Sequence, residues 1–246
     1  SVDEYVEFGL WGWAASRYSG AWVSFKAVSE TVESGRSMDV QPLRRFVQPG
    51  GDAPAPGAYG YRADDFLTPA IEQRLSSKLS AFSEFARLNS IDRLIVAAPQ
   101  ARIGIVVIGK AYHDVMDVLA QSGLDEAALD RAGVRIYKPG LVFPIDKGRM
   151  ADFARGLDHV LVVEEKASVV EQQLKDLVFN WPQRPSIAGK ADLDGGELIT
   201  WLGQLRPATL AAPLARWLAR VAPDLPQPEV ACIMRPALPS NESDGM

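Results

Sequence analysis

The hydrophobic pattern of the second half of the chain predicts an α/β fold. Short apolar runs typical of buried strands occur at residues 102–108, 133–137, 158–163 and 185–188. Amphipathic stretches with helical periodicity separate and follow them, at residues 111–121, 150–156, 168–179 and 205–220. Apolar strands that alternate with amphipathic helices predict a three-layer α/β fold, with a mostly parallel sheet between helices.

The first half of the chain has a different pattern. Helical spacing of bulky apolar residues predicts helices over residues 2–17 and 68–89. A turn at 18–20 leads into residues 21–27, whose alternation predicts a strand. Prolines and glycines crowd residues 48–61, which are therefore expected to form a loop or linker. A domain boundary is expected within that loop or at the helix after it.

Composition narrows the class of protein. The 246 residues carry a formal net charge of −5, which argues against nucleic acid as a partner. No apolar run reaches the length of about 20 residues that a membrane span needs, so no membrane partner is expected. The single cysteine, Cys232, excludes an intrachain disulfide framework and a four-cysteine metal or iron–sulfur site. A reducing, cytoplasmic setting is expected.

The segment from Gly104 to Lys110 has the glycine spacing of a phosphate loop, but its chemistry differs. The residues between Gly104 and Gly109 are β-branched and apolar, which suits a buried strand better than amides exposed to a phosphate. Ala111 stands where a magnesium-binding Ser or Thr is required. A connecting turn is the preferred interpretation, and nucleotide binding is the alternative that loss of ATP binding in Lys110→Ala would identify.

Charged residues follow two of the predicted strands. Lys110 follows the strand at 102–108, and Glu164, Glu165 and Lys166 follow the strand at 158–163. The carboxyl ends of parallel strands are where open α/β sheets place ligands or partner contacts, and acids at these ends can act as general bases. The alternative for the glutamates and Lys166 is a solvated strand end whose charges pair locally.

Other familiar catalytic arrangements are missing from the sequence. His113 and His159 lack neighbours at metal-ligand spacing, and His113 with Asp114 is interpreted as a surface pair. No serine has the flanking glycines of a nucleophile elbow, and Cys232 lies in a proline-rich tail. The residues alone therefore give an α/β domain without a self-sufficient catalytic constellation.

Several ordered segments resemble the indolepyruvate ferredoxin oxidoreductase family of thiamine-dependent 2-oxoacid:ferredoxin oxidoreductases. They span roughly residues 2–220. The matching segments include Gly9-Leu-Trp-Gly-Trp-Ala-Ala-Ser-Arg-Tyr-Ser-Gly20, Phe85-Ala-Arg87, Gly109-Lys-Ala-Tyr112, Ile136-Tyr-Lys138, Val162-Val-Glu-Glu-Lys166, Glu171-Gln172, Arg184-Pro185 and Gly189-Lys190.

The resemblance implies a domain organisation. Residues 1–47 correspond to the C-terminal part of a thiamine pyrimidine-binding-type α/β domain, and residues 48–94 to a linker and long helix. Residues 95–190 correspond to a transketolase C-terminal-like domain, and residues 191–246 to a helical extension and flexible tail. The chain is thus expected to be a fragment of a larger enzyme.

The resemblance also implies an activity for the whole enzyme. The family oxidatively decarboxylates aryl or branched 2-oxoacids to acyl-CoA with thiamine diphosphate, magnesium and iron–sulfur clusters, and passes electrons to ferredoxin. This chain has neither the Gly-Asp-Gly segment of a diphosphate–magnesium site nor cluster cysteines. It is therefore expected to bind no cofactor and to be inactive alone. Ala167, Pro139-Gly-Leu141 and Phe143 depart from the family pattern, which leaves the substrate open.

No catalytic residue is predicted in this chain, but six residues are candidates for an interface or for the mouth of a site. They are Ser16, Arg17, Lys26, Lys110, Glu165 and Lys166. Their expected partners are the remaining domains or subunits of the oxidoreductase. The alternative function is a non-catalytic assembly or regulatory module of transketolase C-terminal type. Apolar surface around Trp11 and Trp22 is expected to be exposed, which predicts aggregation or an oligomer.

Overall fold

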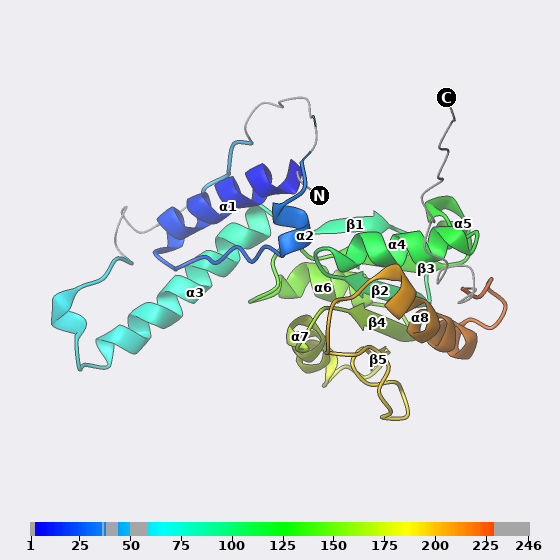
Figure 1. Cartoon of the computed structure of the whole chain (residues 1–246). Helices are drawn as coiled ribbons and strands as arrows, with labels where there is room; N and C mark the ends of the chain where they lie inside the picture. The colour runs from blue at the N-terminus through cyan, green and yellow to red at the C-terminus, as the bar shows by residue number, and fades with distance from the viewer. Residues whose placement is uncertain (1–2, 36, 38–43, 50–58, 229–246) are drawn as a thin grey trace, which may run out of the picture. The chain divides into compact units, whose positions relative to one another are not determined.

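The computed structural model describes residues 3–35, 37, 44–49 and 59–228. The chain divides into two compact units (Figure 1). The first, called here the helical unit, comprises residues 1–93 with 139–152, and the second, called the sheet unit, comprises residues 94–138 with 153–246. Each unit has its own hydrophobic core, and each is described separately.

The sheet has five strands in the order β1-β3-β2-β4-β5. Their bounds are β1 Arg93–Val96, β2 Ile103–Val107, β3 Val134–Lys138, β4 His159–Val163 and β5 Ser186–Ala188. Strand β2 pairs in parallel with β3 and β4, and β4 pairs in parallel with β5. At the centre, Ile105 lies opposite Ile136 on one side and Leu161 on the other. The predicted α/β class with a mostly parallel sheet is confirmed.

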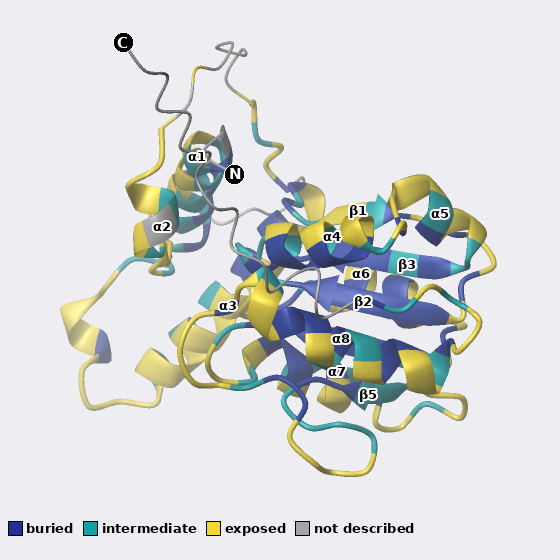
Figure 2. Ribbon diagram, turned by 45° about the vertical axis from the view of Figure 1, so that its right-hand side comes forward, coloured by how far each residue is buried: buried dark blue, intermediate teal, exposed yellow. Residues whose placement is uncertain are grey.

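Helices cover both faces of the sheet, which explains why the central strands are apolar throughout. The helices of the sheet unit are α4 Ala111–Gln121, α5 Glu126–Arg131, α7 Val169–Val178 and α8 Pro207–Val221. Helices α4 and α8 pack together on one face, while α7 lies on the other (Figure 1). This arrangement follows from right-handed crossovers, because the β2-to-β3 and β4-to-β5 connections run in opposite directions across the sheet. All five residues of β2 are buried, as Figure 2 shows.

Close packing also explains a glycine inside strand β2. A Cβ built on Gly104 would lie 2.5 Å from Leu157 Cδ1 and 2.8 Å from Phe153 Cζ. A side chain at this position would have to displace the ends of the Leu157 and Phe153 side chains, so glycine lets the strand lie close to the covering layer.

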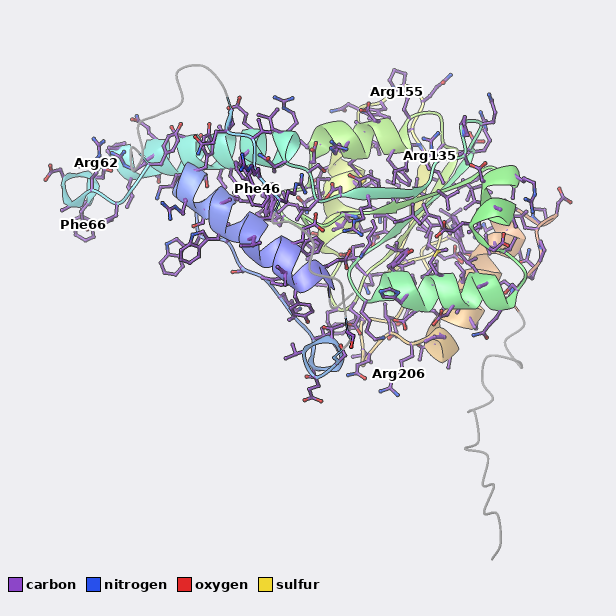
Figure 3. All side chains as sticks on the ribbon, turned by 90° about the horizontal axis from the view of Figure 1, so that it is seen from above. Phe46, Arg62, Phe66, Arg135, Arg155 and Arg206 are labelled. Carbon is purple, nitrogen blue, oxygen red and sulfur yellow. The ribbon has the colours of Figure 1, made fainter. Side chains whose placement is uncertain are left out.

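The helical unit is built around two packed helices. Helix α1 spans Asp3–Ser19 and α3 spans Ala70–Leu88. Between them in the sequence come the short helix α2 (Ser29–Val32) and the 3₁₀-helix η1 (Ala63–Asp65). Trp11 of α1 makes edge contacts with Phe82 and Phe85 of α3, at centroid distances of 5.7 and 5.9 Å. Phe46, labelled in Figure 3, lies 6.1 Å from Phe85 and completes this aromatic core.

Buried Asn89 connects three segments of the helical unit. Its side-chain amide donates to Val47 O and accepts from Val47 N, each at 2.7 Å. Its backbone carbonyl accepts from Trp11 Nε1, also at 2.7 Å. Trp11 is only 2% exposed, so its predicted place on an exposed apolar surface is wrong: the rings of α3 and the Asn89 carbonyl satisfy both its apolar body and its N–H. The prediction holds for Trp22, which is fully exposed.

The predicted strand at 21–27 does not form. These residues make no strand pairing, and no neighbouring strand edge is available to them among the described residues of the helical unit. Instead the apolar side chains pack along α1: Phe25 lies 5.2 Å from the ring of Tyr5 and 6.0 Å from that of Phe8. The alternating apolar side chains therefore face the surface of helix α1 and not the core face of a sheet.

Most other predicted elements occur within a few residues of their expected bounds. Helix α4 has the predicted limits, whereas α6 occupies Lys147–Ala154 instead of 150–156. Strand β1, of four residues, and helix α5, of six, were not predicted. Among the described residues, no helix has the length and apolar character required to cross a bilayer.

Candidate functional site

The carboxyl edge of the sheet gathers charged residues from three strands. Because β2, β4 and β5 run parallel, the residues that follow them lie at the same edge. Lys110 follows β2, Glu164 to Lys166 follow β4, and Lys190 follows β5. This edge contains three of the predicted site residues, Lys110, Glu165 and Lys166.

Lys110 sits in the turn between β2 and α4. Gly109 adopts a φ of 57°, a left-handed conformation that glycine permits without strain. The Lys110 ammonium donates to Asp114 Oδ2 at 2.7 Å, one helical turn farther on, and to Leu205 O at 2.8 Å. In a phosphate loop the lysine ammonium would bind the nucleotide phosphates. Here the Lys110 ammonium is already bonded to a carboxylate and a carbonyl of the same chain, which supports the interpretation as a connecting turn.

Asp114 is buried, so its interpretation as part of a surface pair with His113 is wrong. The helical periodicity places it on the inner face of α4, with Val115 and Val118. Burial raises the pKa of Asp114 above its ordinary value, although its hydrogen bond with Lys110 opposes the shift. Asp117 and Glu165 add smaller repulsive effects in the same direction as burial.

Glu164 caps the first turn of α7. Its two carboxylate oxygens accept from the backbone N–H groups of Val170 at 3.0 Å and Glu171 at 3.1 Å. The side chain is buried, and a carboxylate at a helix N-terminus is favoured by the dipole and by the unpaired N–H groups there. The alternative of a solvated strand end is therefore wrong for Glu164, which is a structural cap.

Glu171 and Lys190 link α7 to the end of β5. Glu171 accepts from Lys190 N at 3.0 Å and from the Lys175 ammonium at 2.6 Å. The Lys190 ammonium donates to Glu164 O and, at 3.4 Å, to Thr200 O. Burial lowers the pKa of Lys190, and the carboxylates of Glu164 and Glu171 oppose that shift.

Glu165 and Lys166 both bind the segment that precedes α8. Glu165 Oε1 accepts from Leu205 N at 2.8 Å, and the Lys166 ammonium donates to Gly203 O. Lys166 has a φ of 60°, so its backbone turns sharply after the strand. The contacts of both residues are thus with the chain's own backbone.

The carboxylates of this edge do not fit a magnesium–diphosphate site. Asp114, Glu164 and Glu165 each accept from an ammonium or backbone N–H, and Glu171 accepts from both kinds of donor. Within residues 3–35, 37, 44–49 and 59–228, no group of three or more His, Cys, Asp or Glu residues could hold a metal ion. No catalytic step through thiamine diphosphate is therefore derived from these residues.

The other three predicted site residues belong to the helical unit. Ser16 lies in α1 and donates through Oγ to Ala21 O at 2.7 Å, which holds the turn after the helix. Arg17 and Lys26 are exposed. Cys232, excluded as a nucleophile from the sequence, lies outside the described residues.

Sequence reasoning missed three polar residues of the carboxyl edge: Asp114, Glu171 and Lys190. Asp114 lies four residues after Lys110, which is the spacing of a helical ion pair and could have indicated the contact. Glu171 and Lys190 lack such a signal, because their hydrogen bond joins α7 to the end of β5 across 19 residues of sequence.

Comparisons with known proteins agree on one family. The family model described as "Indolepyruvate oxidoreductase domain" matches residues 93–230, more than half of the chain. The chain is 35% identical over 102 residues to the indolepyruvate oxidoreductase subunit IorA of Pyrococcus abyssi, covering 42% of this chain and 15% of that protein. It is 29% identical over 122 residues to IorA of Methanothermobacter marburgensis, covering 50% of this chain and 18% of that protein.

Solved structures give more distant matches. A 2-oxoglutarate:ferredoxin oxidoreductase from Magnetococcus marinus aligns with a TM-score of 0.35 and 16% identity, over 60% of this chain and 24% of that chain. A split-gene transketolase aligns with a TM-score of 0.34 and 16% identity, over 55% of this chain and 42% of that chain. These alignments establish no activity for this chain.

The extent of the family match decides which family the chain belongs to. It covers strands β1 to β5 and the residues of the carboxyl edge. The chain spans less than a fifth of the length of the IorA proteins it matches. The chain belongs to the indolepyruvate oxidoreductase domain family.

Proposed function

We propose that this chain is a segment of an indolepyruvate-type 2-oxoacid:ferredoxin oxidoreductase that supplies fold and contact surfaces and does not turn over alone. The family match over residues 93–230 carries the proposal. The larger enzyme would convert an aryl or branched 2-oxoacid to acyl-CoA and pass the electrons to ferredoxin. Its thiamine diphosphate, magnesium and iron–sulfur clusters would be bound by other parts of the protein.

The polar network supports a structural role for this segment. Lys110 and Glu165 are bound to a neighbouring part of the same chain, and Lys166 donates to the same segment. In the proposed enzyme these three residues, together with Ser16, Arg17 and Lys26, contact other domains or subunits or line the mouth of the site. In this proposal residues 1–47 close a pyrimidine-binding domain and residues 95–190 form the transketolase C-terminal-like domain.

Two measurements test the proposal. Titration calorimetry of the 246-residue chain with thiamine diphosphate and magnesium is expected to show no binding, and tight magnesium-dependent binding would contradict the assignment of that cofactor to other domains. A polypeptide expressed with its neighbouring coding sequence is expected to reduce ferredoxin when given indolepyruvate, coenzyme A, thiamine diphosphate and magnesium. The chain alone, assayed in parallel, is the control and is expected to be inactive.

The surrounding coding sequence provides a further test. An in-frame Gly-Asp-Gly domain downstream, together with a domain upstream that carries the pyrimidine-activating glutamate, would support the oxidoreductase. Stop codons on both sides would contradict it, and would favour a non-catalytic assembly or regulatory module.

A further inference from the structure

Residues 200–206, called here the strap, lie across the carboxyl edge of the sheet. They connect buried Ile199 to the start of α8 at Pro207. The strap has no helix or strand of its own. Its contacts with the edge come from side chains that follow three different strands, so it touches residues far apart in the sequence.

Three lysines and one glutamate hold the backbone of the strap. Lys190 donates to Thr200 O at 3.4 Å, Lys166 donates to Gly203 O, and Lys110 donates to Leu205 O at 2.8 Å. Glu165 accepts from Leu205 N at 2.8 Å. The strap is therefore fixed by its main-chain groups, independently of most of its own side chains.

Apolar burial holds the strap at one position only, Leu205, where the contacts from Lys110 and Glu165 also converge. Leu205 is the one buried side chain of the strap. Trp201 and Leu202, which would be strong anchors if they were inserted, are 64% and 66% exposed. A segment with few buried apolar contacts and with side-chain-to-backbone bonds belongs to the low-stability part of a fold, which opens locally before the core does.

The place of the strap gives this local opening a consequence. In open parallel α/β sheets the carboxyl edge is where ligands reach the protein, and here the strap lies over it. We propose that the strap is a lid latched by Lys110, Glu165 and Lys166, which opens as a unit and uncovers the charged carboxyl edge. The inference concerns contacts within this chain and is independent of the reaction of the larger protein.

Hydrogen exchange of the full chain, read by mass spectrometry on a peptide covering the strap, tests the latch. Lys110→Met and Glu165→Ala each remove one contact with the strap, and Lys110→Met also removes the ion pair with Asp114. Both are expected to raise exchange in the strap about tenfold, because charge-assisted hydrogen bonds are the stronger class. Lys166→Asn does the same while keeping a residue that tolerates φ near 60°. Peptides from β2 and β4 are expected to keep wild-type exchange.

Two matched variants separate the latch from general damage. Glu165→Gln keeps a side-chain oxygen that accepts from Leu205 N and is expected to restore most of the protection lost in Glu165→Ala. Arg102→Met removes an ion pair with Asp158, with contacts of 2.6 and 2.7 Å, at the amino end of the same strands, and is expected to leave the strap unchanged. Equal exchange in the strap of wild type and all three latch variants would overturn the proposal, as would loss of protection in β2 and β4.

Acetylation of lysines by an amine-reactive ester tests whether opening uncovers the edge. In Glu165→Ala, the acetylation rate of Lys110 is expected to rise several-fold relative to that of Lys175, whose side chain is already 45% exposed against 20% for Lys110. Faster exchange in the strap without faster acetylation of Lys110 would show fraying that leaves the edge covered, and would contradict the lid.

Discussion

The two units of this chain are stabilised in different ways. The sheet unit buries aliphatic strands between helices. All of β2 is buried, and so is β4 apart from half-buried His159. The helical unit buries an aromatic cluster between α1 and α3, while Trp13 and Trp22 remain exposed. The helical unit exposes large apolar side chains beside its aromatic core, and the sheet unit exposes Phe179, Trp201 and Leu202 outside its central strands. The two units therefore differ in what fills their cores, aliphatic strands covered on both faces against packed aromatic rings.

The largest expected effect tests the aromatic core. Trp11→Ala removes a buried ring that contacts Phe82 and Phe85 and donates to Asn89 O. We expect a loss of about 3–5 kcal/mol in the free energy of unfolding of the helical unit, measured by urea denaturation. Hydrogen exchange should rise in α1 and α3 and stay low in β2. Trp13→Ala is the matched control, and an equal loss there would contradict the assignment of the core to Trp11.

A comparable substitution tests the sheet. Ile105 is fully buried between Ile136 and Leu161. Ile105→Ala should reduce the free energy of unfolding of the sheet unit by about 2–5 kcal/mol, and Ile105→Val by about 0.5–1.5 kcal/mol. Urea denaturation with exchange of β2 to β4 peptides measures both. Equal effects of the two variants would show that the site relaxes around the cavity and that packing there is loose.

The cap of α7 should have an intermediate effect. Glu164→Ala leaves the N–H groups of Val170 and Glu171 without their acceptor, at a cost of about 1–3 kcal/mol in unfolding free energy. Faster exchange confined to the first turn of α7 is the expected local signature. Glu164→Gln keeps one acceptor oxygen and should lose less; a larger loss than in the alanine variant would contradict the capping role.

Asp114 should give the sheet unit a pH dependence. Because burial raises its pKa in the folded state, the folded protein binds the proton more tightly than the unfolded chain. The resulting stabilisation is present below the ordinary aspartate pKa and is lost as pH rises through the raised value. Asp114→Asn should therefore make the urea midpoint depend less on pH as the pH rises above the ordinary aspartate pKa. A midpoint of identical pH dependence in both proteins would contradict the raised pKa.

Replacing the exposed tryptophans should have the smallest effect on stability. It should have a large effect on self-association. Trp13→Ser with Trp22→Ser should change the unfolding free energy by less than about 0.5 kcal/mol, because both side chains are exposed. The proposed self-association should weaken in this double variant, as measured by sedimentation velocity over a range of concentrations. A monomeric wild-type chain at every concentration would contradict the predicted oligomer.

The success of the sequence analysis differs between the two units for the same physical reason. In the sheet unit, runs such as the one at 102–108 predicted strands because burial on both faces leaves a continuous apolar signal. In the helical unit, the alternation at 21–27 satisfied the local rule for a strand, yet these residues pair with no strand in the described part of the chain. Pairing is a tertiary property, so alternation alone does not establish a strand.

The carboxyl edge shows the same division. The sequence alone placed Lys110, Glu165 and Lys166 at strand ends and predicted the parallel sheet that brings strand ends together. It excluded a phosphate loop from the apolar residues between Gly104 and Gly109, and family membership was recognisable from ordered motifs. These conclusions rest on local periodicity and residue chemistry, which a single chain displays in its sequence.

Only the tertiary structure decided what the charges at that edge do. In the folded chain Glu164 caps a helix and Asp114 is buried. Lys110 donates to the backbone of Leu205, 95 residues away in the sequence. Periodicity reports which face of an element is buried, but it carries no information on which distant backbone group will lie within hydrogen-bonding distance. Strand order and the path of the strap set those distances.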